Sequence, residues 1–193
     1  MVNQMVQIPA KPLTLAEFLS LPETQPAMEF IDGQLVQKPM PRGKHSKLQG
    51  RLVTEINAIA ETQRIALALP ELRCTFGDRS IVPDIAVFTW NRIPLDAEGD
   101  IANEFHAAPD WMVEILSPDQ NQSNVTAKIL HSLKFGCRIG WLIDPNIKSV
   151  LVYPSGQQPE FLQKPAEKLL MPDFLAQMQL TVADLFSWLK VNI

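Results

Sequence analysis

Two acidic residues each interrupt an otherwise apolar stretch of this sequence. Asp84 lies within the run IVPDIAVF, and Glu114 lies within the run WMVEILS. An ionised carboxylate inside a β-sheet is costly unless it is paired or binds a metal ion. Two carboxylates on neighbouring strands suit Mg²⁺ or Mn²⁺, which prefer oxygen ligands and keep several water molecules. The alternative is that each carboxylate pairs with an arginine or caps a turn.

The segments around these two acids predict the scaffold that positions them. Apolar, β-branched runs predict strands over Ile81–Phe88 and Trp111–Leu116, and a further strand pair over Ile139–Ile143 and Ser149–Tyr153. Between the second and third strands, Val125–Phe135 has a helical pattern and is followed by Gly136. The order strand, strand, helix, strand, strand predicts an α/β or α+β fold with a mixed central sheet flanked by helices.

The remaining segments predict three helices and a hairpin. In Leu13–Leu21, Thr14 and Glu17 have the spacing of a capping box. Asp32-Gly33 lies between two apolar stretches and is typical of a hairpin turn, so both residues are interpreted as turn formers. The predicted elements are the helix Leu13–Leu21, the hairpin Glu29–Lys38, the helix His45–Gln63 and the helix Val182–Leu189.

Length and composition favour one globular domain. We expect it to span residues 1–193, with residues 1–12 as a loose arm. The net charge of −4 argues against a protein that coats long stretches of nucleic acid, so any DNA contact must use a local basic patch. No apolar run approaches the roughly 20 residues of a membrane helix, and no signal peptide is evident. We therefore expect a cytoplasmic protein that does not contact a membrane.

Several short motifs resemble one protein family. They are Pro83-Asp84, Glu114 followed by Ile115-Leu116-Ser117-Pro118, Glu29-Phe30-Ile31-Asp32-Gly33, His45 at the start of the long helix, and Trp141-Leu142-Ile143-Asp144-Pro145. In their order and spacing along the chain, these motifs resemble the Uma-two family of restriction endonucleases, a cyanobacterial type within the PD-(D/E)XK nuclease superfamily. The resemblance covers nearly the whole chain. It implies a restriction-endonuclease-like core and a Mg²⁺- or Mn²⁺-dependent endonuclease that hydrolyses DNA phosphodiester bonds. Asp84 and Glu114 would bind the metal ion and take part in catalysis.

The catalytic lysine is the main departure from the superfamily pattern. The pattern expects Glu-x-Lys on the second strand, whereas this chain has Leu116 at the lysine position. The resemblance implies a lysine on the following helix instead, where Lys128 falls. Such a lysine would orient or help to deprotonate the attacking water; the alternative is an exposed helix lysine. Asn124, Ala127 and Ser132 also depart from the family pattern, which leaves a reduced or altered activity open.

Two further residues are candidates for the site. The resemblance implies that Glu29 lies near the metal as a third carboxylate, and the alternative is a surface acid of the hairpin. His45 is a candidate contact for phosphate or the attacking water, and the alternative is a structural hydrogen bond. Asp110, next to Pro109, is interpreted as a loop acid.

A basic segment surrounds the start of the long helix. It comprises Arg42, Lys44, Lys47 and Arg51. Lys44, Lys47 and Arg51 share one helical face, which could contact a DNA backbone beside the site. A solvated basic helix face is the alternative.

Two functions remain open at this point. The first is metal-dependent cleavage of DNA, which the sequence does not separate from cleavage of RNA. The second is a catalytically inactive nuclease-fold module that binds DNA or a protein partner. We also expect a homodimer, because a duplex backbone has matching two-fold symmetry. The helix Val182–Leu189 and apolar residues of Ile81–Val87 are its candidate contacts.

Overall fold

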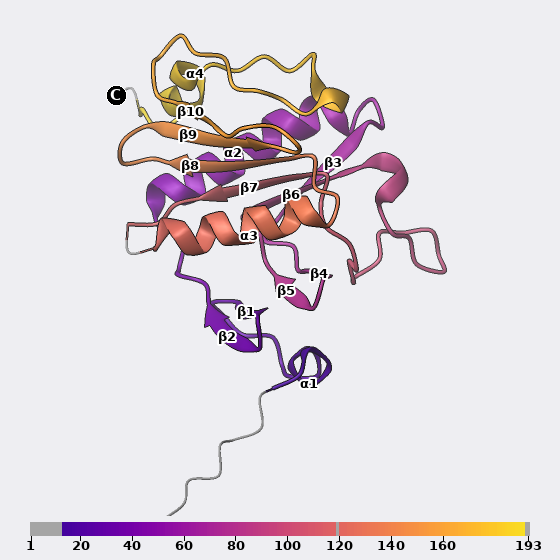
Figure 1. Ribbon diagram of the computed structural model, residues 1–193. Helices are drawn as coiled ribbons and strands as arrows, with labels where there is room; N and C mark the ends of the chain where they lie inside the picture. Colours follow the sequence, from indigo (N-terminus) through magenta and orange to yellow (C-terminus); the bar gives the residue numbers. More distant parts are fainter. Residues whose placement is uncertain (1–12, 119, 192–193) are drawn as a thin grey trace, which may run out of the picture.

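A computed structural model describes residues 13–118 and 120–191 of the chain. The predicted loose arm, residues 1–12, lies outside the described residues. Within the described ranges the strands form a large and a small sheet, and the small sheet lies below the large one in Figure 1. The fold class is α+β, with a mixed sheet between helices, as the sequence predicts.

The large sheet carries most of the fold. Its strand order is β10-β9-β8-β7-β6-β3. The strands are β3 (Ala66–Pro70), β6 (Ile85–Thr89), β7 (Trp111–Ile115), β8 (Ile139–Asp144), β9 (Ser149–Pro154) and β10 (Glu160–Leu162). β7 and β8 run parallel, and the other neighbours in this sheet are antiparallel. The predicted order around the two acids is therefore confirmed, whereas β3 and β10 were not predicted.

Two long helices cover opposite faces of this sheet (Figure 1). On one face, α2 (Gly43–Ala60) buries Leu48, Leu52 and Ile56 in the larger apolar core. On the other face, α3 (Gln122–Lys134) buries Val125 and Ile129 in a second core. Because both faces are covered, the central strands are apolar almost throughout and show no polar alternation.

A glycine sets the distance between α3 and the sheet. Gly140 lies in β8, opposite Met112 of β7. A Cβ atom at this position would lie 2.2 Å from Cγ2 of Ile129, which is closer than two carbon atoms can approach. The absence of a side chain at residue 140 therefore allows α3 to lie directly on the sheet.

The small sheet has the order β2-β1-β5-β4. Its strands are β1 (Met28–Ile31), β2 (Gln34–Gln37), β4 (Cys74–Phe76) and β5 (Arg79–Ile81). The β1–β2 hairpin is confirmed: Asp32 and Gly33 have φ angles of 51° and 79°, the left-handed values that a type I′ turn requires. The short helix α1 (Leu15–Leu19) precedes it, and its predicted capping box is present.

One predicted strand is wrong. The apolar run Ile81–Phe88 is not continuous, because β5 ends at Ile81 in the small sheet and β6 begins at Ile85 in the large sheet. Pro83 lies in the gap and has no N–H group to donate to a neighbouring strand. The chain therefore passes from one sheet to the other immediately before Asp84.

The C-terminal part adds apolar side chains to the core that α2 covers, together with residues of β8 and β9. It contains η2 (Asp173–Leu175) and α4 (Val182–Ser187), while η1 (Trp90–Arg92) follows β6. α4 buries Val182, Leu185 and Phe186. Residues 81–87 are also fully buried. The predicted dimer contact over residues 81–87 is therefore wrong, because these residues are buried in the core, whereas α4 stays a candidate contact.

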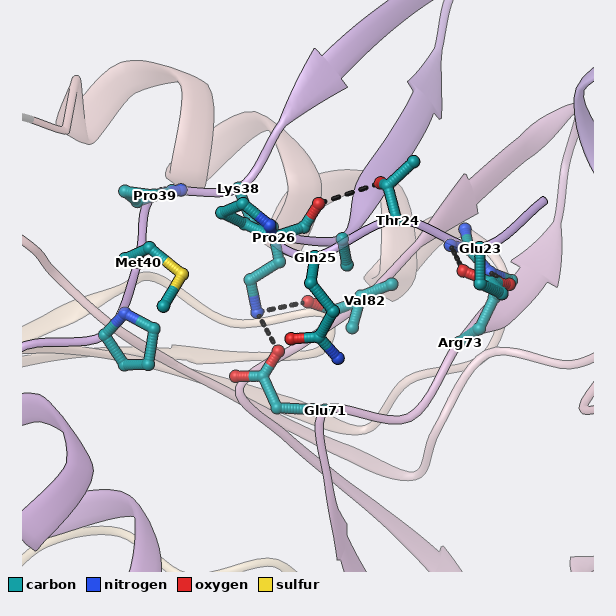
Figure 2. Close-up of a pocket in the computed structure, with 12 residues that line it drawn as sticks. Glu23, Thr24, Gln25, Pro26, Lys38, Pro39, Met40, Glu71, Arg73 and Val82 are labelled. Atoms are coloured by element: carbon teal, nitrogen blue, oxygen red, sulfur yellow. Dashed lines mark hydrogen bonds and ion pairs between the residues drawn. The ribbon is translucent and has the colours of Figure 1, made fainter. Parts of the chain in front are cut away.

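A cavity of about 410 Å³ lies among the segments that connect the two sheets. Figure 2 shows its wall, to which the chain before β1, the chain after β2 and the turns near Glu71 and Val82 contribute.

Among the described residues, no helix is both long and apolar enough to cross a membrane.

Candidate active site

The structure brings Asp84 and Glu114 to the same end of one strand pair. Asp84 directly precedes β6, and Glu114 lies in β7; Ile85 pairs with Val113 in the antiparallel register. The backbone N–H of Ile115 donates to Oδ2 of Asp84 at 2.6 Å. Both carboxylates are almost completely buried. The predicted adjacency of the two strands is therefore confirmed.

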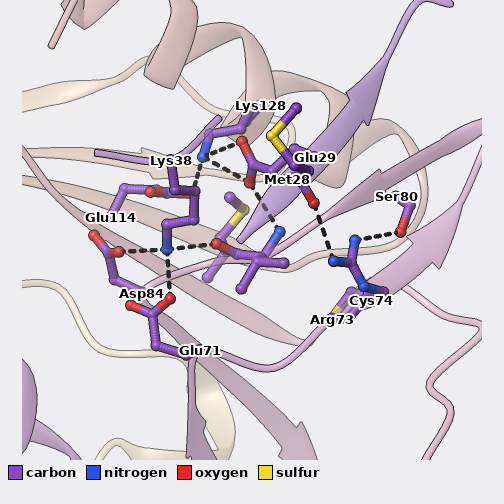
Figure 3. Close-up of polar contacts among 12 residues, drawn as sticks. Met28, Glu29, Lys38, Glu71, Arg73, Cys74, Ser80, Asp84, Glu114 and Lys128 are labelled. Atoms are coloured by element: carbon purple, nitrogen blue, oxygen red, sulfur yellow. Dashed lines mark hydrogen bonds and ion pairs between the residues drawn. The ribbon is translucent and has the colours of Figure 1, made fainter. Parts of the chain in front are cut away.

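Lys128 reaches the same place from α3. Its Nζ lies 2.9 Å from Oε1 of Glu114 and 3.1 Å from Oε1 of Glu29 (Figure 3). Glu29 belongs to β1, and its Oε1 also accepts a hydrogen bond from the N–H of Val82 at 2.8 Å. Lys128 and Glu29 are both buried, so the alternatives of an exposed helix lysine and a surface hairpin acid are wrong.

A second lysine, which the sequence reasoning missed, lies in this cluster. Lys38 follows β2, and its Nζ contacts Oδ1 of Asp84 at 2.8 Å, the carbonyl oxygen of Val82 at 2.7 Å and Oε2 of Glu71 at 3.0 Å (Figure 3). Its side chain is 7% exposed. In the sequence, Lys38 stands in the proline-containing stretch QKPMPRG, where nothing distinguishes it from a solvated lysine.

Three residues from α2 and the β3–β4 turn surround Asp84. Nε2 of His45 lies 3.0 Å from Oδ2 of Asp84. Gln49 donates from Nε2 to the carbonyl oxygen of Asp84 at 2.8 Å and to Oε1 of Glu71 at 3.0 Å. Glu71 has a φ of 51°, a left-handed conformation that is unusual for a glutamate. Gln49 and Glu71 were also missed, because their roles depend on contacts between distant segments.

Burial and charge act differently on the two central acids. For Asp84, burial alone would raise the pKa, but Lys38 and His45 outweigh it and hold the pKa well below its usual value. For Glu114, burial and the nearby Asp84 raise the pKa to about 7, although Lys128 and Lys38 oppose this. Asp84 is therefore the stably ionised member of the pair.

Lys128 keeps its charge in this environment. Burial alone would lower its pKa, but Glu114, Glu29 and Asp84 together raise the pKa above its usual value. The pKa of Lys38 is raised in the same way, since burial is outweighed chiefly by Asp84. Both ammonium groups therefore act as fixed positive charges among the carboxylates.

The donor set suits a hard divalent cation. The carboxylates of Glu29, Asp84 and Glu114 are buried and that of Glu71 is partly exposed; their lysine partners are Lys38 and Lys128, and Asp84 also faces His45. Oε1 of Glu114 is buried and accepts no well-directed hydrogen bond, although it lies in ion-pair distance of Lys128. Within residues 13–118 and 120–191, no three His, Cys, Asp or Glu side chains are arranged to hold an ion together. In the present arrangement the lysines lie between the carboxylates.

Leu116, at the position where the superfamily has its catalytic lysine, supplies no charged group to the cluster. It directly follows β7, is partly exposed, and donates its N–H to the carbonyl oxygen of Ile143 at 2.8 Å. The cluster instead receives ammonium groups from Lys128 on the helix and Lys38 beyond the hairpin.

The basic segment is separate from the buried cluster. Lys44, Lys47 and Arg51 are exposed on α2, as a DNA-contacting face requires, and Arg42 is the N-cap residue of this helix. Arg51 also forms an ion pair with Glu55 at 2.6 Å. His45 belongs to the first turn of α2 but points inward, so the helix links the exposed basic face to Asp84.

A further buried acid, Asp110, lies at the opposite end of the β6–β7 pair. Asp110 is 1% exposed and accepts hydrogen bonds from N–H and Oγ1 of Thr89 at 2.8 and 3.0 Å. It also forms ion pairs with Arg92 at 2.9 Å and Arg138 at 3.2 Å. Asp110 lies in the loop before β7, as interpreted from the sequence, and its buried contacts anchor this end of the sheet.

Comparisons with known proteins agree with this fold. The model of the Uma2 family, described as "Putative restriction endonuclease", matches residues 15–183. A similar solved structure is that of "a putative nuclease belonging to DUF820 from Anabaena variabilis ATCC 29413". The two chains are 55% identical and superpose with a TM-score of 0.91 over 93% of this chain and 100% of that chain. No curated protein matches. Because the family model covers well over half of the sequence, the chain belongs to the Uma2 family of restriction-endonuclease-type proteins.

Proposed function

We propose that this protein is a Mg²⁺- or Mn²⁺-dependent endonuclease that hydrolyses DNA phosphodiester bonds. One observation carries the proposal: three buried carboxylates, those of Glu29, Asp84 and Glu114, converge with only two buried lysines at the end of the β6–β7 pair. A buried excess of negative charge is costly unless a cation neutralises it. Membership of a nuclease family supports the same conclusion.

Asp84 and Glu114 would hold the metal ion. A bound divalent ion polarises the phosphate and lowers the pKa of a coordinated water molecule. Asp84 is suited to this role because it is ionised and fixed by the N–H of Ile115 and by His45. His45 is therefore a positioning residue for Asp84, because its Nε2 contacts Oδ2 of that residue. Its other ring nitrogen, Nδ1, has no hydrogen-bond partner among the described residues.

Lys128 would orient the attacking water and the phosphate. Its raised pKa keeps the ammonium protonated, so it is a poor acceptor for a proton from water. As a hydrogen-bond donor it can hold a water molecule or stabilise the charge that develops on the phosphate. Glu29 fixes the direction of this ammonium through its contacts with both Lys128 and the N–H of Val82.

The exposed basic face of α2 would bind the DNA backbone. Lys44 and Lys47 lie on the helix that also carries His45, so a backbone bound there would run beside the buried cluster. Such contacts position a duplex without reading its sequence. A homodimer remains a prediction, and its interface would have to lie outside residues 81–87, which are buried.

Cleavage of a supercoiled plasmid tests this function. The wild-type protein is incubated with Mg²⁺, with Mn²⁺ and with EDTA, beside Asp84→Ala and Lys134→Met, a control at an exposed lysine of α3. We expect nicking by the wild type and the control only when metal is present, and none by Asp84→Ala. Binding of DNA by a wild type that never cleaves would favour the alternative, an inactive nuclease-fold module.

A further inference from the structure

The position of Lys38 has a consequence for how the site takes up a metal ion. We propose that the Lys38 ammonium occupies the cation-binding position of Asp84 in the metal-free protein, and that an incoming divalent ion displaces it into the adjacent cavity, where it binds a substrate phosphate. This inference rests on the proposed function, and it assigns a residue that neither the family motifs nor the sequence reasoning includes.

The contacts of Asp84 leave one approach for a cation. Oδ2 accepts from the N–H of Ile115 at 2.6 Å and lies 3.0 Å from Nε2 of His45. Oδ1 has one partner among the described residues, the ammonium of Lys38 at 2.8 Å. A metal ion that binds Asp84 through Oδ1 must therefore take the place of this ammonium, because two cations cannot share it without strong repulsion.

The surroundings of the Lys38 ammonium resemble those of a bound cation. Its Nζ lies within 3.0 Å of three oxygens: Oδ1 of Asp84, Oε2 of Glu71 and the carbonyl of Val82. Carboxylate and carbonyl oxygens are also the ligands of hard divalent ions. The lysine thus satisfies, with its own charge, oxygens that would otherwise be buried without a counter-ion.

The structure also provides a place for the displaced side chain. Lys38 lines the cavity of about 410 Å³, together with Glu71, Met40 and Pro26 (Figure 2). The side chain of Glu71 is 42% exposed, so the Lys38–Glu71 contact faces the open part of the cavity. The backbone N–H of Lys38 is held by the carbonyl oxygen of Ala27 at 2.9 Å. Rotation about the side-chain bonds therefore suffices, and the strand need not move.

The exchange would couple metal binding to phosphate binding. While Lys38 neutralises Asp84, its ammonium is buried and directed away from any substrate. Once a divalent ion replaces it, the ammonium needs a new negative partner at the cavity. A DNA phosphate beside the metal supplies that charge, and Lys is a common phosphate ligand. The site would then bind its substrate tightly only after it has bound its metal.

Two binding measurements test this inference. Mn²⁺ affinity is measured by titration calorimetry, and affinity for a short DNA duplex is measured in Ca²⁺ and in EDTA. The variants are Lys38→Met and Lys38→Gln, with Lys134→Met as the control. Two neutral replacements of different polarity ensure that one folded variant is available, which thermal unfolding verifies.

We expect Lys38→Met or Lys38→Gln to bind Mn²⁺ about 10-fold more tightly or better, the scale of changes beside a metal site. The same variants should lose most of the Ca²⁺-dependent gain in duplex affinity that the wild type and Lys134→Met show. Unchanged or weaker Mn²⁺ binding by the Lys38 variants, or an unchanged gain in duplex affinity, would overturn the inference while leaving the proposed function intact. Absence of Mn²⁺ binding in every protein would overturn both.

Discussion

The two ends of the β6–β7 pair both bury an aspartate, but the charged residues around the two aspartates differ. At one end, the single charge of Asp110 meets two arginines, Arg92 and Arg138, and two donors from Thr89. At the other end, Asp84 and Glu114 belong to a group of four carboxylates with two lysines. At the first end the charges balance, because Arg138 also pairs with Asp173, whereas the second end has more carboxylates than lysines.

This difference shows which buried acid indicates a site. Burial alone does not, because Asp110 and Asp84 are equally inaccessible to solvent. Asp110 has no need of a ligand, since its arginines are partly exposed and its remaining acceptors are used. In the Asp84 cluster, burial raises the pKa of Glu114 to about 7, and a further cation would favour its ionised form. Incomplete neutralisation is what points to a metal ion.

The largest expected effect separates the two aspartates by metal binding. Asp84→Asn removes the charged ligand, so Mn²⁺ affinity should fall by more than the roughly 10- to 100-fold typical of outer-shell changes. Asp110→Asn should bind Mn²⁺ like the wild type. Titration calorimetry on both variants measures this directly. Equal losses in the two variants would mean that the ends of the strand pair are not functionally distinct.

The next effect concerns the cations rather than the acids. Lys128→Met removes the ammonium beside Glu114 but leaves Asp84 and its partners in place, so cleavage should fall by roughly 10²-fold or more. Lys134→Met, on the same helix but exposed, is the matched control. Rates of plasmid cleavage at saturating Mn²⁺ give the comparison. Wild-type rates in Lys128→Met would transfer the role to another residue, first of all Lys38.

The smallest effect is on stability, and an acid-to-amide substitution should cost more at the Asp110 end than at the Glu114 end. Asp110→Asn weakens contacts to two arginines and should lower the free energy of unfolding by about 1.5–3 kcal/mol, the scale of charged hydrogen bonds. Glu114→Gln relieves repulsion from Asp84 while Lys128 keeps Glu29. In EDTA it should therefore change the free energy of unfolding by less than about 1 kcal/mol, or raise it. Urea unfolding measures both, and a large loss in Glu114→Gln would contradict the proposed charge imbalance.

The sequence predicts those parts of the site that depend on local pattern. Asp84 and Glu114 stand out because each is a single charge in an apolar run, and their strands pair as the pattern predicts. Lys128 and Glu29 came from the family resemblance, since neither has a local signal. Asp110 also lacks one, because its burial depends on Arg138, a residue from a distant segment.

Lys38 could not be predicted for a related reason. Its burial arises from the pairing of β1 with β5, which brings Val82 to its ammonium across 44 residues of sequence. The error over Ile81–Phe88 has the same origin, since two apolar strands of different sheets follow each other with only Val82, Pro83 and Asp84 between them. Hydrophobic pattern identifies strands but does not say to which sheet each belongs.

The bare backbone at Gly140 makes the site sensitive to a change far from its chemistry. Ile129, which a Cβ at residue 140 would strike, is the immediate neighbour of Lys128. Gly140→Ala would lift the helix and carry the Lys128 ammonium away from contacts of 2.9 and 3.1 Å, where even small displacements break a hydrogen bond. The distance between α3 and β8 thus fixes the position of the Lys128 ammonium, and there is no room for one added methyl group at residue 140.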